Sequence, residues 1–287
     1  MPTDTDVELT AFSGSETGSK VRVAAVQMAS GPTVTANLEE AFRLIEEAAA
    51  KGAQLVVLPE YFCIMGMKDT DKLAVREQPG EGEIQNFLSE AAKRFGIWLA
   101  GGSVPLVSPV SSKVYNSCLV YDGQGQQVAR YDKIHLFGLS LGSENFAEER
   151  TIDAGNKIVA IDSPFGRMGL SICYDLRFPE LYRMMGKVDI ILAPSAFTAI
   201  TGKAHWETLI RARAIENQAY LIAPAQGGFH VNGRETNGDS MIVDPWGVII
   251  DRLPRGAGVV VAEIDRAYQS SVRASLPALE HRCLLAC

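Results

Sequence analysis

The chain of 287 residues has few side chains that bind metals, and those it has are scattered. Its four histidines lie at positions 135, 205, 230 and 281, and its five cysteines lie at 63, 118, 173, 283 and 287. No CxxC pair or Cys–His cluster has the spacing of a zinc site, and an odd number of irregularly spaced cysteines does not predict a disulfide framework. We therefore expect no metal site, no cofactor, and free thiols in a reducing compartment.

The sequence also lacks an excess of basic residues and any long apolar run. Lysines and arginines number 27 against 34 aspartates and glutamates, which gives a formal net charge of −7. Nucleic-acid binding depends on clustered basic residues, so this balance argues against a nucleic-acid partner. The apolar stretches are short and interrupted by charges, and the first residues show no basic-then-apolar signal pattern. We therefore expect no membrane span and a cytoplasmic location.

What is present is the pattern of one α/β domain behind a polar leader. Residues 1–20 are rich in Thr, Ser, Gly and Asp and show little hydrophobic periodicity, which predicts a disordered leader. Residues 21–287 show no shift in composition that would divide them, so they are expected to form a single domain.

Apolar runs and amphipathic segments alternate along this domain and predict a mixed sheet covered by helices. Two hairpins are indicated by the turn sequences Asp122-Gly123-Gln124-Gly125 and Asp244-Pro245-Trp246-Gly247. The segment after Asp265 has no strand pattern and is expected to be an arm that packs on a partner subunit. The other expected strands lie near 21–28, 54–58, 97–100, 169–172, 188–192 and 220–223. The helices lie near 35–51, 84–95 and 204–218, and a further helix begins at Pro179.

Cys173 is placed where an apolar strand ends and a short helix, opened by Pro179 and Glu180, begins. A strand-to-helix turn exposes the sulfur, and a nearby helix N-terminus lowers the pKa of a thiol, so a reactive cysteine is one interpretation. The alternative is a small buried hydrophobe, which is what most free cysteines are.

Two other strands end in residues that would support a reactive thiol. Glu60 follows the apolar strand 54–58, and it is either a structural group or an acid–base group whose pKa is raised by burial. Lys133 is either a solvated charge at a sheet edge or a cation that stabilises a thiolate and an oxyanion. A cysteine that hydrolyses an amide needs both a proton acceptor and an oxyanion partner.

The three segments, taken in order, resemble the Glu-Lys-Cys signature of the nitrilase superfamily of carbon–nitrogen hydrolases. They are Leu58-Pro59-Glu60, Lys133-Ile134-His135-Leu136-Phe137 and the run 171–180 around Cys173. The resemblance covers nearly everything after residue 20. It implies a four-layer αββα sandwich with two mixed β-sheets over residues 21–287, including the C-terminal arm, and at least a homodimer.

The resemblance also implies a role for each matching residue. Cys173 would attack an amide carbonyl and form a thioester, and Glu60 would be the general base. Lys133 and the backbone N–H of Tyr174 would stabilise the oxyanion. A second active-site glutamate of the family matches Glu148 in Phe146-Ala147-Glu148, although the adjacent Glu149 leaves the assignment open by one residue.

The C-terminal half resembles the branch of the superfamily that hydrolyses deaminated glutathione to 2-oxoglutarate and cysteinylglycine. The matching segments include 194–198, 201–207, 211–218 and 244–247. The chain departs from that branch in the shortened loop 138–143 after Phe137, which would border the active site and influence substrate choice. Alternatives are an ω-amidase acting on free 2-oxoglutaramate or another dicarboxylate monoamide, an N-carbamoyl hydrolase, or a non-catalytic scaffold of the same fold.

The remaining polar candidates are expected to have structural roles. His135 and His205 are expected to pack or to support the site indirectly. Arg177 and Glu180 either bind a substrate carboxylate or, as the favoured alternative, form a buried salt bridge at the turn. Asn116 and Cys63 are candidates for neighbours of the site. Arg211 and Arg213 are expected to form ion pairs with Glu207 and Glu216 at helical spacing.

Overall fold

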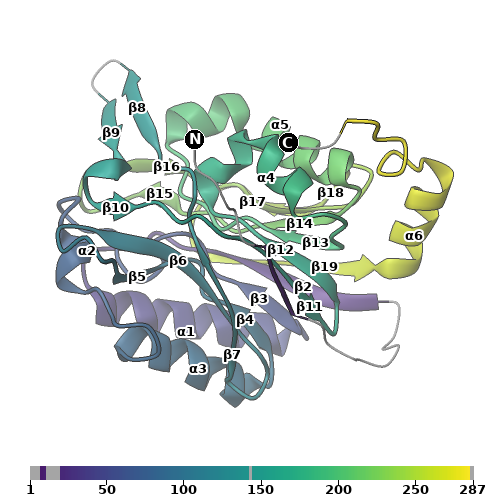
Figure 1. The fold of residues 1–287 in the computed structure, drawn as a ribbon. Coiled ribbons are helices and arrows are strands. Elements are labelled where there is room, and N and C mark those ends of the chain that lie inside the picture. Colours follow the sequence, from purple (N-terminus) through teal and green to yellow (C-terminus); the bar gives the residue numbers. More distant parts are fainter. Residues whose placement is uncertain (1–6, 11–19, 142–143, 285–287) are drawn as a thin grey trace.

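The computed structural model describes residues 7–10, 20–141 and 144–284. Two β-sheets pack face to face, and helices cover the outer face of each sheet, so the chain has the predicted four-layer αββα arrangement (Figure 1). Both sheets contain parallel and antiparallel neighbours, as predicted.

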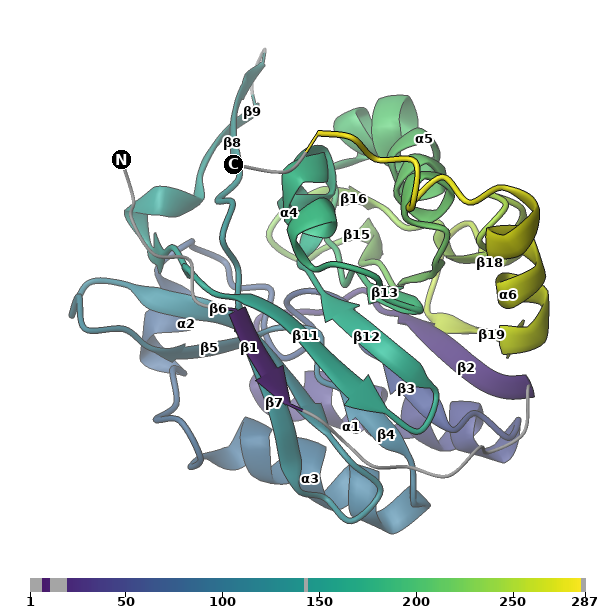
Figure 2. The ribbon, with the colours of Figure 1, turned by 45° about the vertical axis from the view of Figure 1, so that its right-hand side comes forward.

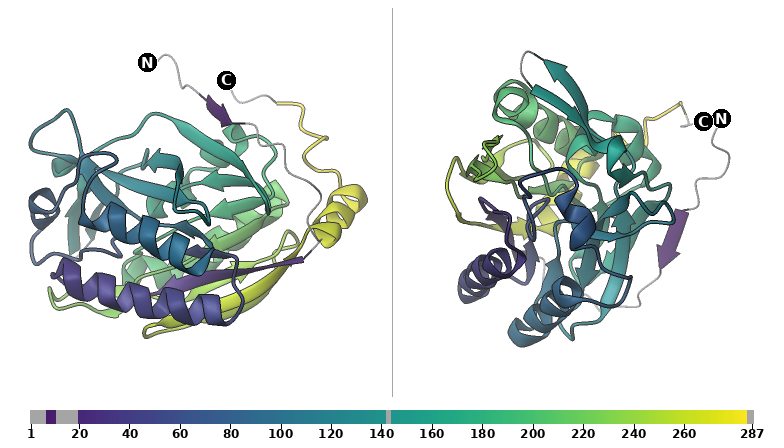
Figure 3. Two further views of the ribbon diagram at one scale, coloured as in Figure 1. Left: turned by 90° about the horizontal axis from the view of Figure 1, so that it is seen from below. Right: turned by 90° about the vertical axis from the view of Figure 1, so that its left-hand side faces the viewer.

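The first sheet has eight strands in the order β10-β6-β4-β3-β2-β19, with β5 and β7 also paired to β6. Helices α1 (Val34–Ala50) and α3 (Glu83–Phe95) lie side by side on its outer face (Figure 3, left). Its strands are β2 (Lys20–Gln27), β3 (Leu55–Val57), β4 (Trp98–Ala100), β5 (Val104–Val107), β6 (Val114–Tyr121), β7 (Gln127–Asp132), β10 (Ile152–Asp153) and β19 (Gly258–Asp265).

The second sheet has seven strands in the order β1-β11-β12-β13-β14-β17-β18. Helices α4 (Pro179–Met184) and α5 (Ala199–Asn217) cover its outer face. Its strands are β1 (Val7–Thr10), β11 (Ile158–Ser163), β12 (Gly166–Leu170), β13 (Ile190–Leu192), β14 (Tyr220–Ala223), β17 (Ser240–Val243) and β18 (Ile249–Leu253).

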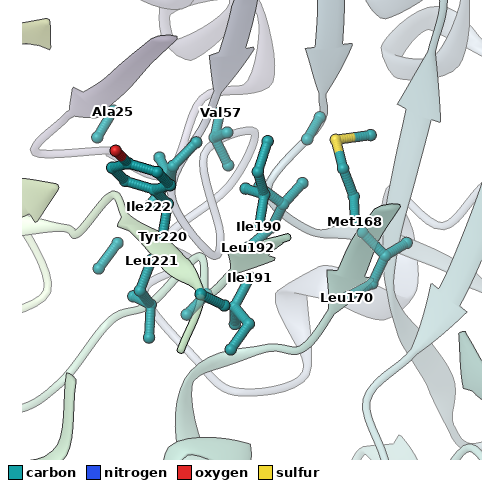
Figure 4. Close-up of a cluster of buried hydrophobic side chains, with 14 of the residues drawn as sticks. Ala25, Val57, Met168, Leu170, Ile190, Ile191, Leu192, Tyr220, Leu221 and Ile222 are labelled. Atoms are coloured by element: carbon teal, nitrogen blue, oxygen red, sulfur yellow. The ribbon is translucent and has the colours of Figure 1, made fainter. Parts of the chain in front are cut away.

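Alternation along the strands divides the apolar side chains between two cores. In β2, Val23 and Ala25 face the second sheet, whereas Ala24 and Val26 face helices α1 and α3. Figure 4 shows part of the core between the sheets, where Ala25 and Val57 of the first sheet face side chains of β12, β13 and β14. Strands that are buried on both faces consist of continuous apolar runs, and these runs allowed the strands to be predicted from the sequence.

Two small hairpins and a short helix stand outside the sheets, close to the ends of the central strands. The hairpin of β8 (Gly138–Leu141) and β9 (Glu144–Ala147) projects from the body (Figure 2), and the second pairs β15 (Gly227–Phe229) with β16 (Glu235–Asn237). Helix α2 (Asp71–Ala74) lies between β3 and α3 in the chain.

The leader differs from its prediction. Val7–Thr10 forms β1, which pairs in parallel with β11, and Lys20 already begins β2. These four residues were predicted to be disordered because a short polar segment has no periodicity of its own, and its strand exists only through pairing with a distant edge. Residues 1–6 and 11–19 lie outside the described part of the chain, as do 142–143 of the expected loop and Cys287 at the other end.

The segment after Asp265, predicted only as an arm without a strand pattern, forms helix α6 (Arg266–Ser275). Its N-terminus is capped by Asp265, whose carboxylate accepts hydrogen bonds from the backbone N–H groups of Ala267 and Tyr268. Gln269 and Arg273 tie the helix to the body of the same chain. Packing on a partner subunit stays a prediction. In the described ranges, no helix is long and apolar enough to cross a membrane.

We expect Arg273→Met to lower the free energy of unfolding by about 1–3 kcal/mol. The guanidinium donates to Asp189 Oδ1 at 2.7 Å, to the Val188 carbonyl at 2.6 Å and to the Gln218 carbonyl at 3.1 Å. Urea unfolding would measure the loss. Arg266→Met is the matched control, because its guanidinium lies 3.9 Å from Asp189 and is half exposed. Equal losses for the two variants would contradict the anchoring role of Arg273.

Candidate active site

Glu60 is held at the carboxyl end of β3 by a tight turn. Only 1 % of its surface is exposed. Tyr61 has a φ of 58°, and its backbone N–H donates to the Ser103 hydroxyl at 2.9 Å. Gly102, with a φ of 46°, passes so close to the turn that a Cβ there would lie 2.0 Å from the Pro59 carbonyl oxygen. The turn therefore needs glycine at 102 and fixes where the Glu60 carboxylate points.

Lys133 follows β7 and is fully buried. Its backbone N–H donates to the Asn116 carbonyl, and its ammonium donates to Glu60 Oε1 at 2.8 Å. The same ammonium donates to Glu148 Oε2 at 2.8 Å and to Oε1 at 3.1 Å. One buried cation therefore binds two carboxylates, and the predicted alternative of a solvated edge charge is wrong.

Glu148 begins the short 3₁₀ helix η1 (Glu148–Arg150), and its carboxylate accepts two hydrogen bonds besides those from Lys133. Oε1 accepts from the Tyr61 hydroxyl at 2.6 Å, and Oε2 accepts from the Phe137 backbone N–H at 2.8 Å. Its own backbone N–H donates to the Phe137 carbonyl. Glu149 is exposed, so it is Glu148 that lies with Lys133.

Cys173 lies just after β12, at the start of the 3₁₀ helix η2 (Cys173–Arg177), and α4 follows with Pro179 in its first turn as predicted. Its φ of 52° is the left-handed conformation, which for a residue other than glycine costs about 1–3 kcal/mol. Its backbone N–H donates to the Pro194 carbonyl at 2.9 Å, which binds the turn to the end of the neighbouring strand β13. The strained turn aims the sulfur towards Glu60.

Asp175 holds this turn from inside. The carboxylate is fully buried and accepts hydrogen bonds from the Ile172 backbone N–H at 2.8 Å and the Tyr131 hydroxyl at 2.7 Å. Its other oxygen accepts from the His135 backbone N–H at 3.1 Å and lies 2.7 Å from His135 Nδ1. His135 therefore supports the turn, as predicted, and Asp175 connects the Cys173 turn with the segment that carries Lys133.

The ionisation of the site follows from one cation shared by two acids. Burial raises the pKa of Glu60, and the neighbouring Glu148 raises it further, against the effect of Lys133. Burial acts in the same direction on Glu148, but Lys133 and the hydrogen bonds from Tyr61 and Phe137 outweigh it and lower that pKa. The two carboxylates therefore differ: Glu148 stays ionised, and Glu60 is the one suited to accept and return a proton.

The environment of the Cys173 thiol differs from its prediction. The residue is only 6 % exposed, and burial, reinforced by the Glu60 charge, raises the pKa of the thiol well above its ordinary value. The turn opens into a cavity between the sheet ends and not into bulk solvent. A helix N-terminus in the following segment is too weak to offset this desolvation, so the resting sulfur is a thiol that hydrogen-bonds the Glu60 carboxylate.

A cavity of about 540 Å³ leads to the sulfur. Phe137 and, from β9, Asn145, Phe146 and Ala147 lie in its wall, whereas residues 138–141 of the loop that was expected to border the site form β8 and are not among the lining residues. Tyr174 follows Cys173 in η2, where the first N–H groups of a helix have no partner in a preceding turn. The further lining residues include Met65, Asp69, Lys72, Thr151, Ala196, Thr198, Asn232 and Arg234.

Sequence reasoning found the supporting residues only in part. Asn116, a possible neighbour of the site, donates to Glu60 Oε1 at 2.9 Å. The contacts of Tyr61 with Glu148 and of Asp175 with Tyr131 were not predicted. The expected Arg177–Glu180 salt bridge is wrong. Arg177 lies over the rings of Tyr174 and Phe197 and contacts His205, because the α4 turn directs Glu180 to the surface.

Other minor predictions have mixed outcomes. The Arg211–Glu207 and Arg213–Glu216 pairs form, with separations of 3.5 Å and 2.9 Å. Cys63 is buried, its thiol donates to the Ser103 carbonyl oxygen, and the residue does not line the cavity. Within the ranges that the structure covers, no three His, Cys, Asp or Glu side chains are grouped as metal ligands.

Comparison with known proteins places this geometry among related hydrolases. Residues 22–274 match the carbon-nitrogen hydrolase family model. A deaminated glutathione amidase from Synechocystis is 43 % identical over 265 residues, which are 90 % of this chain and 97 % of the relative. Omega-amidase NIT2 of Xenopus tropicalis is 36 % identical over 92 % of this chain and 95 % of its own length. Saccharomyces cerevisiae Nit3, a member of branch 10 of the nitrilase superfamily, superposes with a TM-score of 0.82 at 32 % identity, covering 93 % of this chain and 97 % of that one.

We expect Asn116→Leu to move the acid limb of the pH dependence of kcat/KM to higher pH. If Glu60 is the general base, as the resemblance implies, it must be ionised to accept the thiol proton, so kcat/KM should fall as pH falls through the raised pKa of Glu60. Removing the Asn116 amide takes away a hydrogen bond that favours the ionised form, which raises this pKa further. The exposed Asn86→Leu serves as control. An unmoved acid limb would show that Glu60 does not govern it.

We expect Asp175→Asn to lower the free energy of unfolding by about 3 kcal/mol and to reduce kcat as well. The NH₂ group of the asparagine would face O–H or N–H groups that now donate to a carboxylate oxygen, so two donors would oppose each other. The surface variant Asp162→Asn, which loses only a partly exposed pair with Arg167, should cost less than about 1 kcal/mol. Urea unfolding and steady-state kinetics on both variants test this, and normal kcat in Asp175→Asn would contradict the role of Asp175 in holding the turn.

Proposed function

Since the chain belongs to the carbon-nitrogen hydrolase family, we propose that it is an amidase that hydrolyses deaminated glutathione to 2-oxoglutarate and cysteinylglycine. The observation that carries the chemistry is the Cys173 thiol beside a buried Glu60 that shares Lys133 with Glu148. The substrate rests on the relative at 43 % identity over 90 % of the chain. The omega-amidase relative makes free 2-oxoglutaramate the second candidate substrate.

Acylation begins with a neutral thiol and an ionised Glu60. Glu60 takes the proton of the Cys173 thiol while the sulfur attacks the amide carbon, and the carbonyl oxygen becomes an oxyanion. The Lys133 ammonium and the Tyr174 backbone N–H stabilise that charge. Glu60 then returns the proton to the leaving amine, the C–N bond breaks, and the acyl group remains on sulfur as a thioester.

Deacylation repeats the same proton transfers with water. Glu60 takes a proton from water, the hydroxyl attacks the thioester carbon, and the oxyanion forms again beside Lys133. Collapse of this intermediate releases the carboxylic acid, and the proton held by Glu60 returns to the sulfur. Glu148 stays ionised throughout and keeps the Lys133 ammonium charged, since Glu148 and Glu60 raise the pKa of Lys133 well above its ordinary value against the effect of burial.

A small-molecule substrate, a homodimer and a cytoplasmic location complete the proposal. The cavity of about 540 Å³ is within the usual size of a small-molecule site. Size-exclusion chromatography with light scattering reports the number of subunits directly.

Incubating the protein with deaminated glutathione should release 2-oxoglutarate, and Cys173→Ala should reduce kcat by roughly 10³- to 10⁶-fold, as loss of a nucleophile does in other hydrolases. Rapidly quenched wild-type protein should show the mass of an acyl adduct that Cys173→Ala lacks. Cys283→Ala removes an exposed thiol elsewhere and should have normal activity. Absence of turnover by wild-type protein would refute the substrate, and turnover by Cys173→Ala would refute the mechanism.

A further inference from the structure

Lys72 is a cation in the wall of the active-site cavity that lacks a counterion. It lies on α2, its Nζ donates to the Thr151 hydroxyl at 3.3 Å, and it stands 5.4 Å from the centre of the Tyr61 ring. Among the residues described by the structure, none forms an ion pair with it. The other cation of the wall that is not bound to the catalytic carboxylates, Arg234, pairs with Asp69.

An ammonium in this position is incompletely compensated. Burial lowers the pKa of Lys72, and the nearby charges of Glu148 and Asp69 offset that effect only in part. The Thr151 hydroxyl and the Tyr61 ring are neutral partners, which stabilise a charged donor less than a carboxylate does. A ligand that brings an anionic group to this part of the cavity would complete the interactions of Lys72.

The surroundings of Lys72 place it on the side of the cavity where the leaving amine must lie. Tyr61 presents its ring to Lys72 and its hydroxyl to Glu148, and the Thr151 backbone N–H donates to the Glu148 carbonyl. The departing nitrogen must receive a proton from Glu60, so it faces the same group of acids. Arg177 lies elsewhere around the nucleophile, over the rings of Tyr174 and Phe197.

We propose that Lys72 binds a carboxylate carried by the leaving-amine part of the substrate. The inference rests on the proposed function, and for deaminated glutathione this carboxylate is that of the terminal glycine. Free 2-oxoglutaramate releases ammonia and has no such group. Lys72 therefore directs the enzyme towards amides whose amine portion ends in a carboxylate, and away from primary amides with the same acyl group.

The test compares three substrates that share one acyl group: deaminated glutathione, the same molecule with its terminal carboxylate converted to an amide, and free 2-oxoglutaramate. Lys72→Met should lower kcat/KM for the first by about 10- to 100-fold, which is the usual size of a hydrogen bond to a charged group. It should change kcat/KM for the other two by less than about twofold, and Lys72→Arg should restore part of the loss. Lys68→Met, an exposed lysine four residues earlier, is the matched control.

Comparing substrates on one variant makes the result independent of how much of that variant is folded. An equal loss on all three substrates, or no loss on deaminated glutathione, would overturn the role of Lys72 and leave the proposed function intact. Wild-type protein that cleaves 2-oxoglutaramate but not deaminated glutathione would overturn the proposed substrate and this inference together. Wild-type protein that cleaves none of the three would overturn the amidase function itself for this acyl group.

Discussion

The rest of the site depends on one buried ammonium held between two carboxylates. Lys133 donates to Glu60 and to Glu148, and these three groups come from the end of β7, the end of β3 and the start of η1. Removing the cation would leave two acids close together without compensation, which a buried site does not tolerate. The same cation serves both acids, and their further donors differ: Glu148 also accepts from Tyr61 and Phe137, whereas Glu60 also accepts from Asn116.

Cys173, the proposed nucleophile, reaches this cluster from the opposite sheet, so the proposed mechanism requires the two sheets to be packed in register. Cys173 follows β12 of the seven-stranded sheet, whereas Glu60 and Lys133 follow strands of the eight-stranded sheet. Asp175 makes the connection rigid, since it binds the Ile172 backbone on one side and Tyr131 on the other. The core between the sheets therefore sets the distance between sulfur and base.

The sequence singled out the residues beside strands more easily than those that reach the site from strand faces. Glu60, Lys133 and Cys173 each lie beside an apolar strand, but this position left a structural role open for each of them, and their grouping into one site came from the resemblance of the three segments in order. Asn116 gives no such signal, because it lies inside β6 and meets Glu60 only through the pairing of β6 with its neighbours. The prediction of an exposed thiol with a lowered pKa was wrong for a related reason. Whether a turn opens to solvent or to a closed cavity depends on the whole fold.

A buried thiol with a raised pKa is consistent with fast acylation because the site never creates a new charge. In the proposed mechanism Glu60 carries a negative charge at the start, and as the proton moves, that charge passes to the sulfur and then to the substrate oxygen beside Lys133. In a medium of low dielectric, moving an existing charge towards a fixed cation costs far less than separating charges anew. A sulfur of high pKa is also the stronger nucleophile once its proton has left. Burial, which disfavours a free thiolate, thus favours transfer of the proton and attack by the sulfur in one coupled step.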